Sequence, residues 1–347
     1  SAVCFLSALL SLSIIAYGCE TKSGGKKSGG SNAQKKYLKF SGGPTGGTFW
    51  FFGSGISSYL SKNITNLKVS NETSEGSIEN LRKLNSAQVD FGIVYSGDVY
   101  LARRGGLSGD KKKYLNTRAV AYLYKAPAQL AVLKKSNIKK VSDLQGKRVD
   151  IGGPGSGAAA SAERYFKSLG LWDKIKVSTL GYSKAAKSMM DGQIDAMWVL
   201  VGYPTGALIE LSHSKEIELL DLYDDWSKQP LKKSYPFYKA LVIKSEELKG
   251  KYKGIARDTN SFFDSALWVA SNKVSDDDVY NALKTIYTKE GLKYLINIKA
   301  TARQMSIEAG VVGIVTPLHP GAYKFWKEKG LEIPAEAIPA EAKAKTK

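Results

Sequence analysis

A glycine-rich segment between an apolar strand and an apolar helix constrains the fold of this chain most. Residues 41–47 read Ser-Gly-Gly-Pro-Thr-Gly-Gly and lie between a β-like run at 37–40 and a helical pattern at 51–60. This order predicts a strand, a loop and a helix. The first N–H groups of a helix lack partners and carry partial positive charge, and glycine lets a ligand approach them. The segment suits a small anion, although an ordinary tight connection explains the pattern equally well.

The same order recurs along the chain, which predicts an α/β fold with a largely parallel sheet. A second glycine loop, at 152–157, follows a strand and precedes an alanine-rich helix that starts at Ala158. Further strand-like runs lie at 67–71, 89–94, 119–124, 129–133, 146–151, 176–180 and 196–201. Because the second part of the chain repeats the first, we expect two α/β lobes. Their glycine loops would face each other across a cleft at the carboxyl ends of the strands.

Composition favours a globular protein with a basic surface. The chain has 347 residues, a formal net charge of +19 and 43% hydrophobic residues, enough for about two domains. Its lysines are spread throughout, with dense runs such as 26–27, 35–36 and 111–113. No zinc-finger spacing or aromatic-basic sheet signature accompanies them, so we expect no nucleic-acid partner. Attraction of anionic ligands or lipid headgroups to this surface stays open.

The motifs needed for catalysis, metals or cofactors are incomplete. Residues 153–158 fit G-x-G-x-x-A, but the next strand ends without the carboxylate that would hold a ribose. His213 and His319 are far apart and lack ligand spacing. We therefore predict a chain that is not an enzyme and has no catalytic residues, no metal and no cofactor. Asp90 and Asp195 each precede an apolar strand. At this position a carboxylate that caps the start of the strand is favoured over a pair of catalytic general acid and base groups.

The N-terminus has the pattern of a secretory signal. Residues 3–17 are apolar and lead into Gly18-Cys19, with Ala16 nearby, which is similar to the lipobox of bacterial lipoproteins. This predicts a signal peptide over 1–18, lipidation of Cys19 and a flexible Gly/Ser/Lys tether over 19–36. A buried N-terminal helix with an incidental cysteine is the alternative.

Several motifs in order together resemble one family. They are Gly46-Gly47-Thr48-Phe49, residues 73–81, 89–96, 144–149 with 155–157, 191–196 with Gly202-Tyr203-Pro204, and His319-Pro320-Gly321-Ala322. From about residue 39 to 331 the chain resembles TAXI-type solute receptors of TRAP (tripartite ATP-independent periplasmic) transporters. Two departures are Tyr95, where a glutamine is usual, and 235–241, which lacks the usual run of threonine and small residues.

The resemblance implies a two-lobed periplasmic-binding-protein type II fold that closes on a small organic anion. Lobe 1 would comprise 37–125 and 236–331, lobe 2 would comprise 126–235, and 332–347 would be a disordered tail. Family ligands include glutamate, glutamine and dicarboxylates such as 2-oxoglutarate. The chain would be an extracytoplasmic, lipid-anchored monomer that delivers its ligand to TRAP permease subunits.

Combining the loops with the resemblance, we expect the ligand to be held by backbone and hydroxyl groups without a dominant arginine. The predicted ligand-binding residues are Gly46, Gly47, Thr48, Ser74, Gly76, Ser77, Tyr95, Ser96, Ser156, Gly157, Ala158, Gly202 and Tyr203. Two alternatives remain at this point. One is an enzyme that uses the same cleft, and the other is a surface protein whose basic face binds polyanions.

Overall fold

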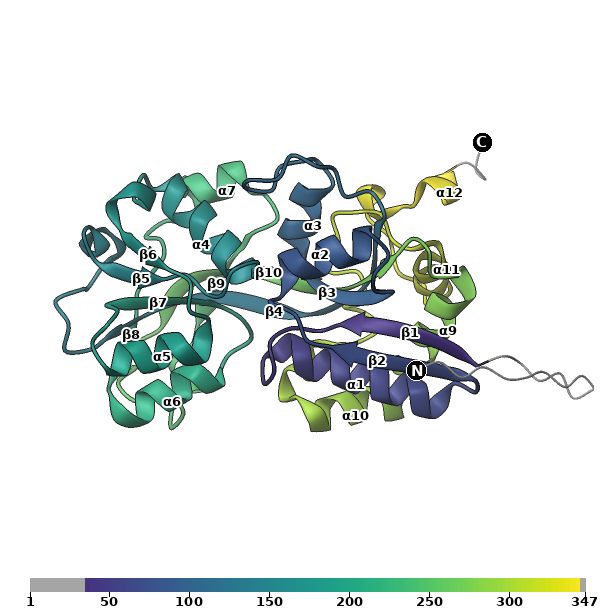
Figure 1. Ribbon diagram of the computed structural model, residues 1–347, viewed down its shortest axis with the longest axis horizontal. Helices are drawn as coiled ribbons and strands as arrows, with labels where there is room; N and C mark the ends of the chain where they lie inside the picture. The colour runs from purple at the N-terminus through teal and green to yellow at the C-terminus, as the bar shows by residue number, and fades with distance from the viewer. Residues whose placement is uncertain (1–34, 344–347) are drawn as a thin grey trace, which may run out of the picture. The chain divides into compact units, whose positions relative to one another are not determined.

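The computed structural model describes residues 35–343, shown as the coloured ribbon in Figure 1. The predicted signal peptide, Cys19 and most of the predicted tether lie outside these residues. The strands are β1 (Lys36–Ser41), β2 (Leu67–Glu72), β3 (Phe91–Tyr95), β4 (Thr117–Leu133), β5 (Arg148–Asp150), β6 (Lys176–Ser178), β7 (Ala196–Leu200), β8 (Ile217–Leu219), β9 (Lys239–Ile243) and β10 (Thr259–Ser271).

Helices connect these strands and cover the sheet (Figure 1). They are α1 (Thr48–Asn63), α2 (Ser77–Asn85), α3 (Ser96–Ala102), α4 (Gly157–Ser168), α5 (Tyr182–Met190), α6 (Gly206–Ser214), α7 (Pro230–Ser234), α8 (Ser245–Leu248), α9 (Asp276–Ile286), α10 (Lys289–Ile298), α11 (Pro320–Glu328) and α12 (Ala340–Lys343). Short 3-10 turns lie at Val141–Leu144, Trp172–Lys174, Trp226–Lys228, Ala300–Gln304 and Ala335–Ala337. No helix within 35–343 has both the length and the apolar character needed to cross a membrane.

The strands form one ten-stranded sheet in the order β2-β1-β3-β10-β4-β7-β5-β6, with β8 added to β4 and β9 to β10. The triplets β2-β1-β3 and β7-β5-β6 are each parallel, as the sequence predicts. The long strands β4 and β10 run antiparallel and join the two triplets. We call the part built on β1–β3 the first half and the part built on β5–β7 the second half.

Each half has its own aromatic core against the sheet. In the first half Phe91 packs edge-on against Trp268, with ring centroids 5.3 Å apart. In the second half Trp198 lies 5.2 Å from Tyr165, and its indole N–H donates to the Ser161 hydroxyl. Both tryptophans are fully buried. Each half therefore holds its strands rigidly and presents its loops at the strand ends.

Asp90 and Asp195 occupy equivalent places in the two halves. The carboxylate of Asp90 accepts from the Lys39 N–H, and that of Asp195 accepts from the Arg148 N–H and pairs with its guanidinium at 2.7 Å. Each aspartate thus ties the start of one parallel strand to its neighbour. The prediction of a capping role at the strand start is confirmed, and the repeat between the halves extends to these contacts.

The crossing between the halves differs from the sequence expectation. Residues 119–124 and 129–133 belong to one continuous strand, β4, because both sections pair with β10 or β7 and Pro127 is accommodated between them. Residues 239–253 bond to the second half: β9 extends the sheet there, and the Ile217 N–H donates to the Lys253 carbonyl. The return to the first half is therefore made by β10 and not by residues 235–241.

The predicted disordered tail is packed as far as residue 343. Ile333 and Ala337 are buried, and the Leu318 N–H donates to the Ala337 carbonyl. A Pro/Ala/Glu/Lys-rich composition favours disorder on average. Here a few apolar side chains, with Ile338 among them, suffice to fix the segment on the core.

Candidate functional site

A cavity of about 760 Å³ lies between the two halves, at the carboxyl ends of the parallel strands. Five helices begin at its wall: α1, α2, α4, α5 and α6. Their N-cap residues are Gly47, Gly76, Ser156, Gly181 and Thr205. Only at Ser156 does the side chain accept a bond from the first turn, at 3.1 Å from the Ala159 N–H. The other four helix starts keep N–H groups and positive dipole ends available to an anion.

The structure brings most of the predicted site residues together at this cavity. Its lining includes Gly46, Gly47, Thr48, Gly76, Ser77, Tyr95, Ser156, Gly157 and Ala158. They come from three helix starts and from the end of β3, so both halves contribute. The Ser77 hydroxyl accepts from the Tyr95 N–H at 2.9 Å, which fixes the start of α2 against β3.

Four predicted residues are placed elsewhere. Ser74 braces its own loop, since its hydroxyl donates to the Gly42 carbonyl and accepts from the Gly76 N–H. The Ser96 hydroxyl donates to the Gly313 carbonyl, and neither residue lines the cavity. Gly202 lies against Thr301, and Tyr203 lines a second cavity of about 520 Å³ near Lys125 and Gln304. These four residues are therefore not part of the cavity lining, and a role for them in binding stays a prediction.

The sequence reasoning missed part of the second half's wall. Residues 179–184 and 205–207 line the cavity there, together with Leu200, Val201 and Glu210, and Glu75 is a missed lining residue of the first half. Gly181, directly before a helical pattern, is a signal that could have identified the first of these loops. Its φ of +80° is a conformation that glycine adopts without strain.

Two buried side chains hold the cavity loops in place. Asp150, at the end of β5, accepts from the N–H groups of Gly152 and Leu180 at 3.0 and 2.7 Å, and burial raises the pKa of its carboxyl. In the first half the Asn80 amide donates to the carbonyls of Gly42 and Ile93. Each side chain thus links two loop segments of its own half and positions the helix starts.

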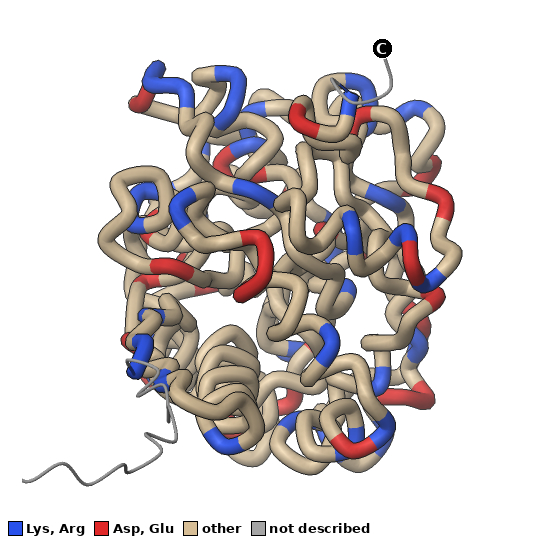
Figure 2. Tube along the Cα trace, turned by 90° about the vertical axis from the view of Figure 1, so that its right-hand side faces the viewer, with Lys and Arg blue, Asp and Glu red and all other residues tan. Residues whose placement is uncertain are grey.

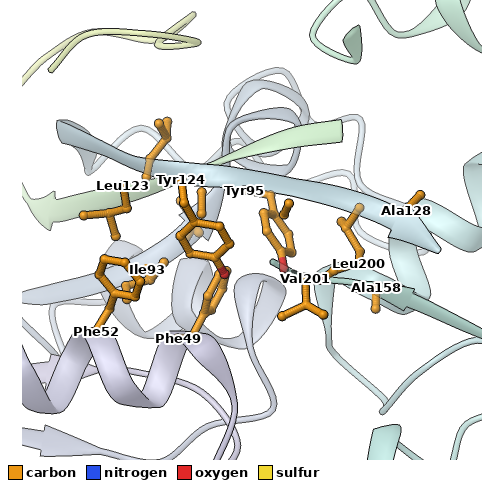
Figure 3. Packing of buried hydrophobic residues seen from close by; sticks show 14 of the residues in the cluster. Phe49, Phe52, Ile93, Tyr95, Leu123, Tyr124, Ala128, Ala158, Leu200 and Val201 are labelled. Atoms are coloured by element: carbon orange, nitrogen blue, oxygen red, sulfur yellow. Dashed lines mark hydrogen bonds between the residues drawn. The ribbon is translucent and has the colours of Figure 1, made fainter. Parts of the chain in front are cut away.

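The deep wall of the cavity is neutral. The hydroxyls of Tyr95 and Tyr182 both donate to the Leu200 carbonyl, at 2.5 and 3.0 Å, and Tyr95 does so across the two halves. Figure 3 shows Tyr95 beside Tyr124, between Phe49 and the pair Leu200 and Val201. Burial raises the pKa of Tyr95 and Tyr182 well above the ordinary value, so both hydroxyls stay protonated.

The charged residues among the described lining of this cavity are exposed. Glu75, Lys184 and Glu210 are exposed members of the lining, and among residues 35–343 no arginine lines it. No cluster in the described part of the chain could hold a metal ion. In Figure 2 lysines and arginines are spread among acidic residues over the view, as expected of a solvated basic surface. The cavity can therefore supply hydrogen-bond donors to an oxyanion without a buried cation.

A family model for the NMT1-like family matches residues 40–330. The chain belongs to the NMT1-like family. Among solved structures, a binding protein of an ABC phosphonate transporter from Pseudomonas aeruginosa aligns with a TM-score of 0.52 and 12% identity, over 90% of this chain and 93% of its own. This likeness shows the fold, which is that of periplasmic solute-binding proteins, as predicted.

Two further structures are similar at lower scores. The alkanesulfonate-binding protein from Xanthomonas axonopodis pv. citri, bound to MOPS, has a TM-score of 0.49 and 16% identity over 89% of this chain and 98% of its own. The periplasmic aliphatic sulphonate binding protein from Escherichia coli has a TM-score of 0.45 and 15% identity over 89% and 88%. The names of all three describe binding proteins. The finer assignment to TAXI-type receptors stays a prediction.

Proposed function

We propose that this chain is an extracytoplasmic solute-binding receptor that captures a small organic anion and delivers it to a membrane permease. The observation that carries this proposal is the convergence of five helix N-termini, from both halves, on one cavity. A ligand held in that place touches both halves at once, so it favours the arrangement in which they are closed.

The available donors are sufficient for tight binding without a counter-ion. A helix N-terminus stabilises an anion by about 0.3–1 kcal/mol, and a hydrogen bond to a charged group contributes about 1.5–3 kcal/mol. Several such contacts, made by donors from both halves, are needed to reach the roughly 8 kcal/mol of micromolar binding after the costs of association. The exposed position of Lys184 and the absence of an arginine from the lining formed by residues 35–343 support recognition by backbone and hydroxyl groups.

The finer proposal is a receptor of the TRAP type for glutamate, glutamine or a dicarboxylate such as 2-oxoglutarate. It rests on the resemblance of the motifs from residue 39 to 331, including Gly46-Gly47-Thr48 at the cavity. Lipidation at Cys19 would anchor a monomer at the membrane that carries the permease. Since two of the similar structures are an alkanesulfonate-binding protein and a binding protein of a phosphonate transporter, sulfonates and phosphonates are tested as well.

A thermal-shift screen tests this function. The panel contains L-glutamate, L-glutamine, 2-oxoglutarate, methylphosphonate and ethanesulfonate. We expect one compound, at 100 times its Kd, to stabilise the chain by about 2.7 kcal/mol. The same compound should leave Gly47→Val unshifted, because a Cβ there already lies 3.0 Å from the Pro44 carbonyl oxygen and the larger side chain blocks the backbone.

The alternatives give different results in the same screen. Consumption of a panel compound would support an enzyme. Salt-sensitive binding to heparin or anionic vesicles, with no shift by any small molecule, would support a polyanion-binding surface protein and contradict the proposal.

Tyr95→Phe should weaken ligand binding about tenfold, since it removes one hydrogen bond that only the closed arrangement makes. Tyr182→Phe is the matched control, because its bond to the same Leu200 carbonyl stays within the second half. Calorimetry with the stabilising compound measures both. Equal ligand affinities for the two variants would show that the hydrogen bond of Tyr95 across the halves does not contribute to ligand binding.

A further inference from the structure

A buried ion pair joins the two halves outside the cavity. Arg164 on α4 in the second half pairs with Asp98 on α3 in the first, with 2.5 Å between Nη2 and Oδ1. The side chains are 9% and 0% exposed. Neither residue lines the cavity, so the pair has no part in direct ligand recognition.

Further polar groups complete what we call the Arg164 cluster: Arg164, Asp98, Asp264 and Tyr238. The Tyr238 hydroxyl accepts from Arg164 Nη1 at 2.9 Å. Asp264, on β10 where the chain returns to the first half, is fully buried and accepts from the Gly97 and Ser265 N–H groups. The buried ionisable groups of the cluster include one guanidinium and two carboxyl groups, and Asp98 Oδ2 has no hydrogen-bond partner.

The cluster is connected to the cavity through one face of α4. Gly157, the first residue of α4, lines the cavity, and a Cβ on it would lie 2.7 Å from Asp98 Oδ2 and 2.3 Å from the Tyr95 ring. Arg164 is seven residues, or two turns, further along and therefore on the same face. Both ends of that face thus contact the other half, Gly157 at Tyr95 and Asp98, and Arg164 at Asp98.

We propose that Arg164 is a positioning residue of the closed cleft, and that its buried pair with Asp98 holds the start of α4 against the first half. The consequence for ligand affinity rests on the proposed function, but the effect on closure does not. Removing the guanidinium leaves Asp98 buried without a counter-charge when the halves are closed, whereas water solvates it when they are open. The loss therefore disfavours the closed arrangement specifically.

Cross-linking without ligand measures this effect. Ser108 and Glu163 lie across the two halves, 2.6 Å apart between Oγ and Oε1. In the full chain with Cys4→Ser and Cys19→Ser, we place Ser108→Cys and Glu163→Cys and measure the rate of cross-linking by a short bis-maleimide. Because only closed molecules react, the rate reports the closed fraction even where it is small.

Arg164→Met should slow cross-linking by about 100-fold, the scale of an uncompensated buried charge. Adding Asp98→Asn should restore most of the rate, which loss of packing alone would not allow. Arg148→Met, which breaks the 2.7 Å pair with Asp195 inside the second half, should leave the rate unchanged.

Arg164→Lys is the second variant, for use if Arg164→Met does not fold, and it should slow the reaction several-fold because lysine cannot reach both Asp98 and Tyr238. The proposal is overturned if a folded Arg164 variant cross-links as fast as the parent protein. It is also overturned if the Arg164 variant is slow and adding Asp98→Asn does not restore the cross-linking rate. Since no ligand is present, failure of the proposed function would leave this result unaffected.

Discussion

Gly157→Ala is expected to weaken ligand binding by about 100-fold while the fold stays intact. The added methyl group would lie 2.3 Å from the Tyr95 ring and 2.7 Å from the Asp98 carboxylate, both in the other half. Overlap of this kind costs about 3 kcal/mol when neither side can move. The clash disappears when the halves separate, so the variant should remain folded and open. Calorimetry for binding and small-angle scattering for the opening measure the two effects.

Gly206→Ala is the control for that variant. Gly206 is likewise the first residue of a helix at the cavity, and a Cβ there meets no atom within 4 Å. We expect Gly206→Ala to bind nearly as the wild type does. If Gly157→Ala binds equally well, the halves are not in contact at α4 in the binding state, and the closed cleft described above is wrong.

Asp264→Asn should abolish a fall in the free energy of unfolding that we expect for the wild type between pH 5 and 8. Burial, reinforced by the neighbouring Asp98, raises the pKa of Asp264 to about 8. An aspartate in the unfolded chain titrates near 3.9. Between these values the folded protein holds one more proton than the unfolded chain, so the free energy of unfolding falls as pH rises. The fall is about 1.4 kcal/mol per pH unit, or roughly 4 kcal/mol from pH 5 to 8, and it ends above pH 8.

Asparagine cannot lose that proton, and its carbonyl oxygen can still accept from the Gly97 and Ser265 N–H groups. Asp264→Asn should therefore show no such fall and should exceed the wild type in stability most at high pH. Asp258→Asn is the control: Asp258 is near the surface and its hydrogen bond with Lys244 lowers its pKa to about 2, so the slope between pH 5 and 8 should persist. Urea denaturation at pH 5, 6.5, 8 and 9.5 gives the comparison, and a wild type without the slope would show that Asp264 is ionised.

The parts of the fold that the sequence predicts are those with local signals. Two glycine loops, Gly46-Gly47-Thr48 and Ser156-Gly157-Ala158, each follow an apolar strand and precede a helix. The signals for strand, loop and helix therefore lie within about 20 residues of one another. The parallel triplets follow from that alternation. The continuity of β4 is not local, because Lys125 and Pro127 interrupt the apolar pattern and only the pairing with β10 and β7 carries the strand through.

For the candidate site too, the sequence predicts the loops but not the direction of each side chain or the contacts between the halves. Tyr95 and Ser96 are adjacent at the junction of β3 and α3, and the sequence does not say which of the two side chains faces the cavity. The structure gives that place to Tyr95 and directs Ser96 to Gly313. Arg164 and Asp98 are 66 positions apart, and no spacing rule relates them. Contacts between the halves depend on the packing of whole elements, which a local pattern does not contain.

Calorimetric titration of the wild type and of Gly47→Val, with the compound that stabilises the chain most, tests the central claim most directly. The claim is that helix starts from both halves hold a small anion in the cavity of about 760 Å³. It predicts one site per chain with a Kd near the micromolar range for the wild type and no binding heat for Gly47→Val. A Gly47→Val isotherm equal to that of the wild type, or no binding by any oxyanion of the panel, would contradict it.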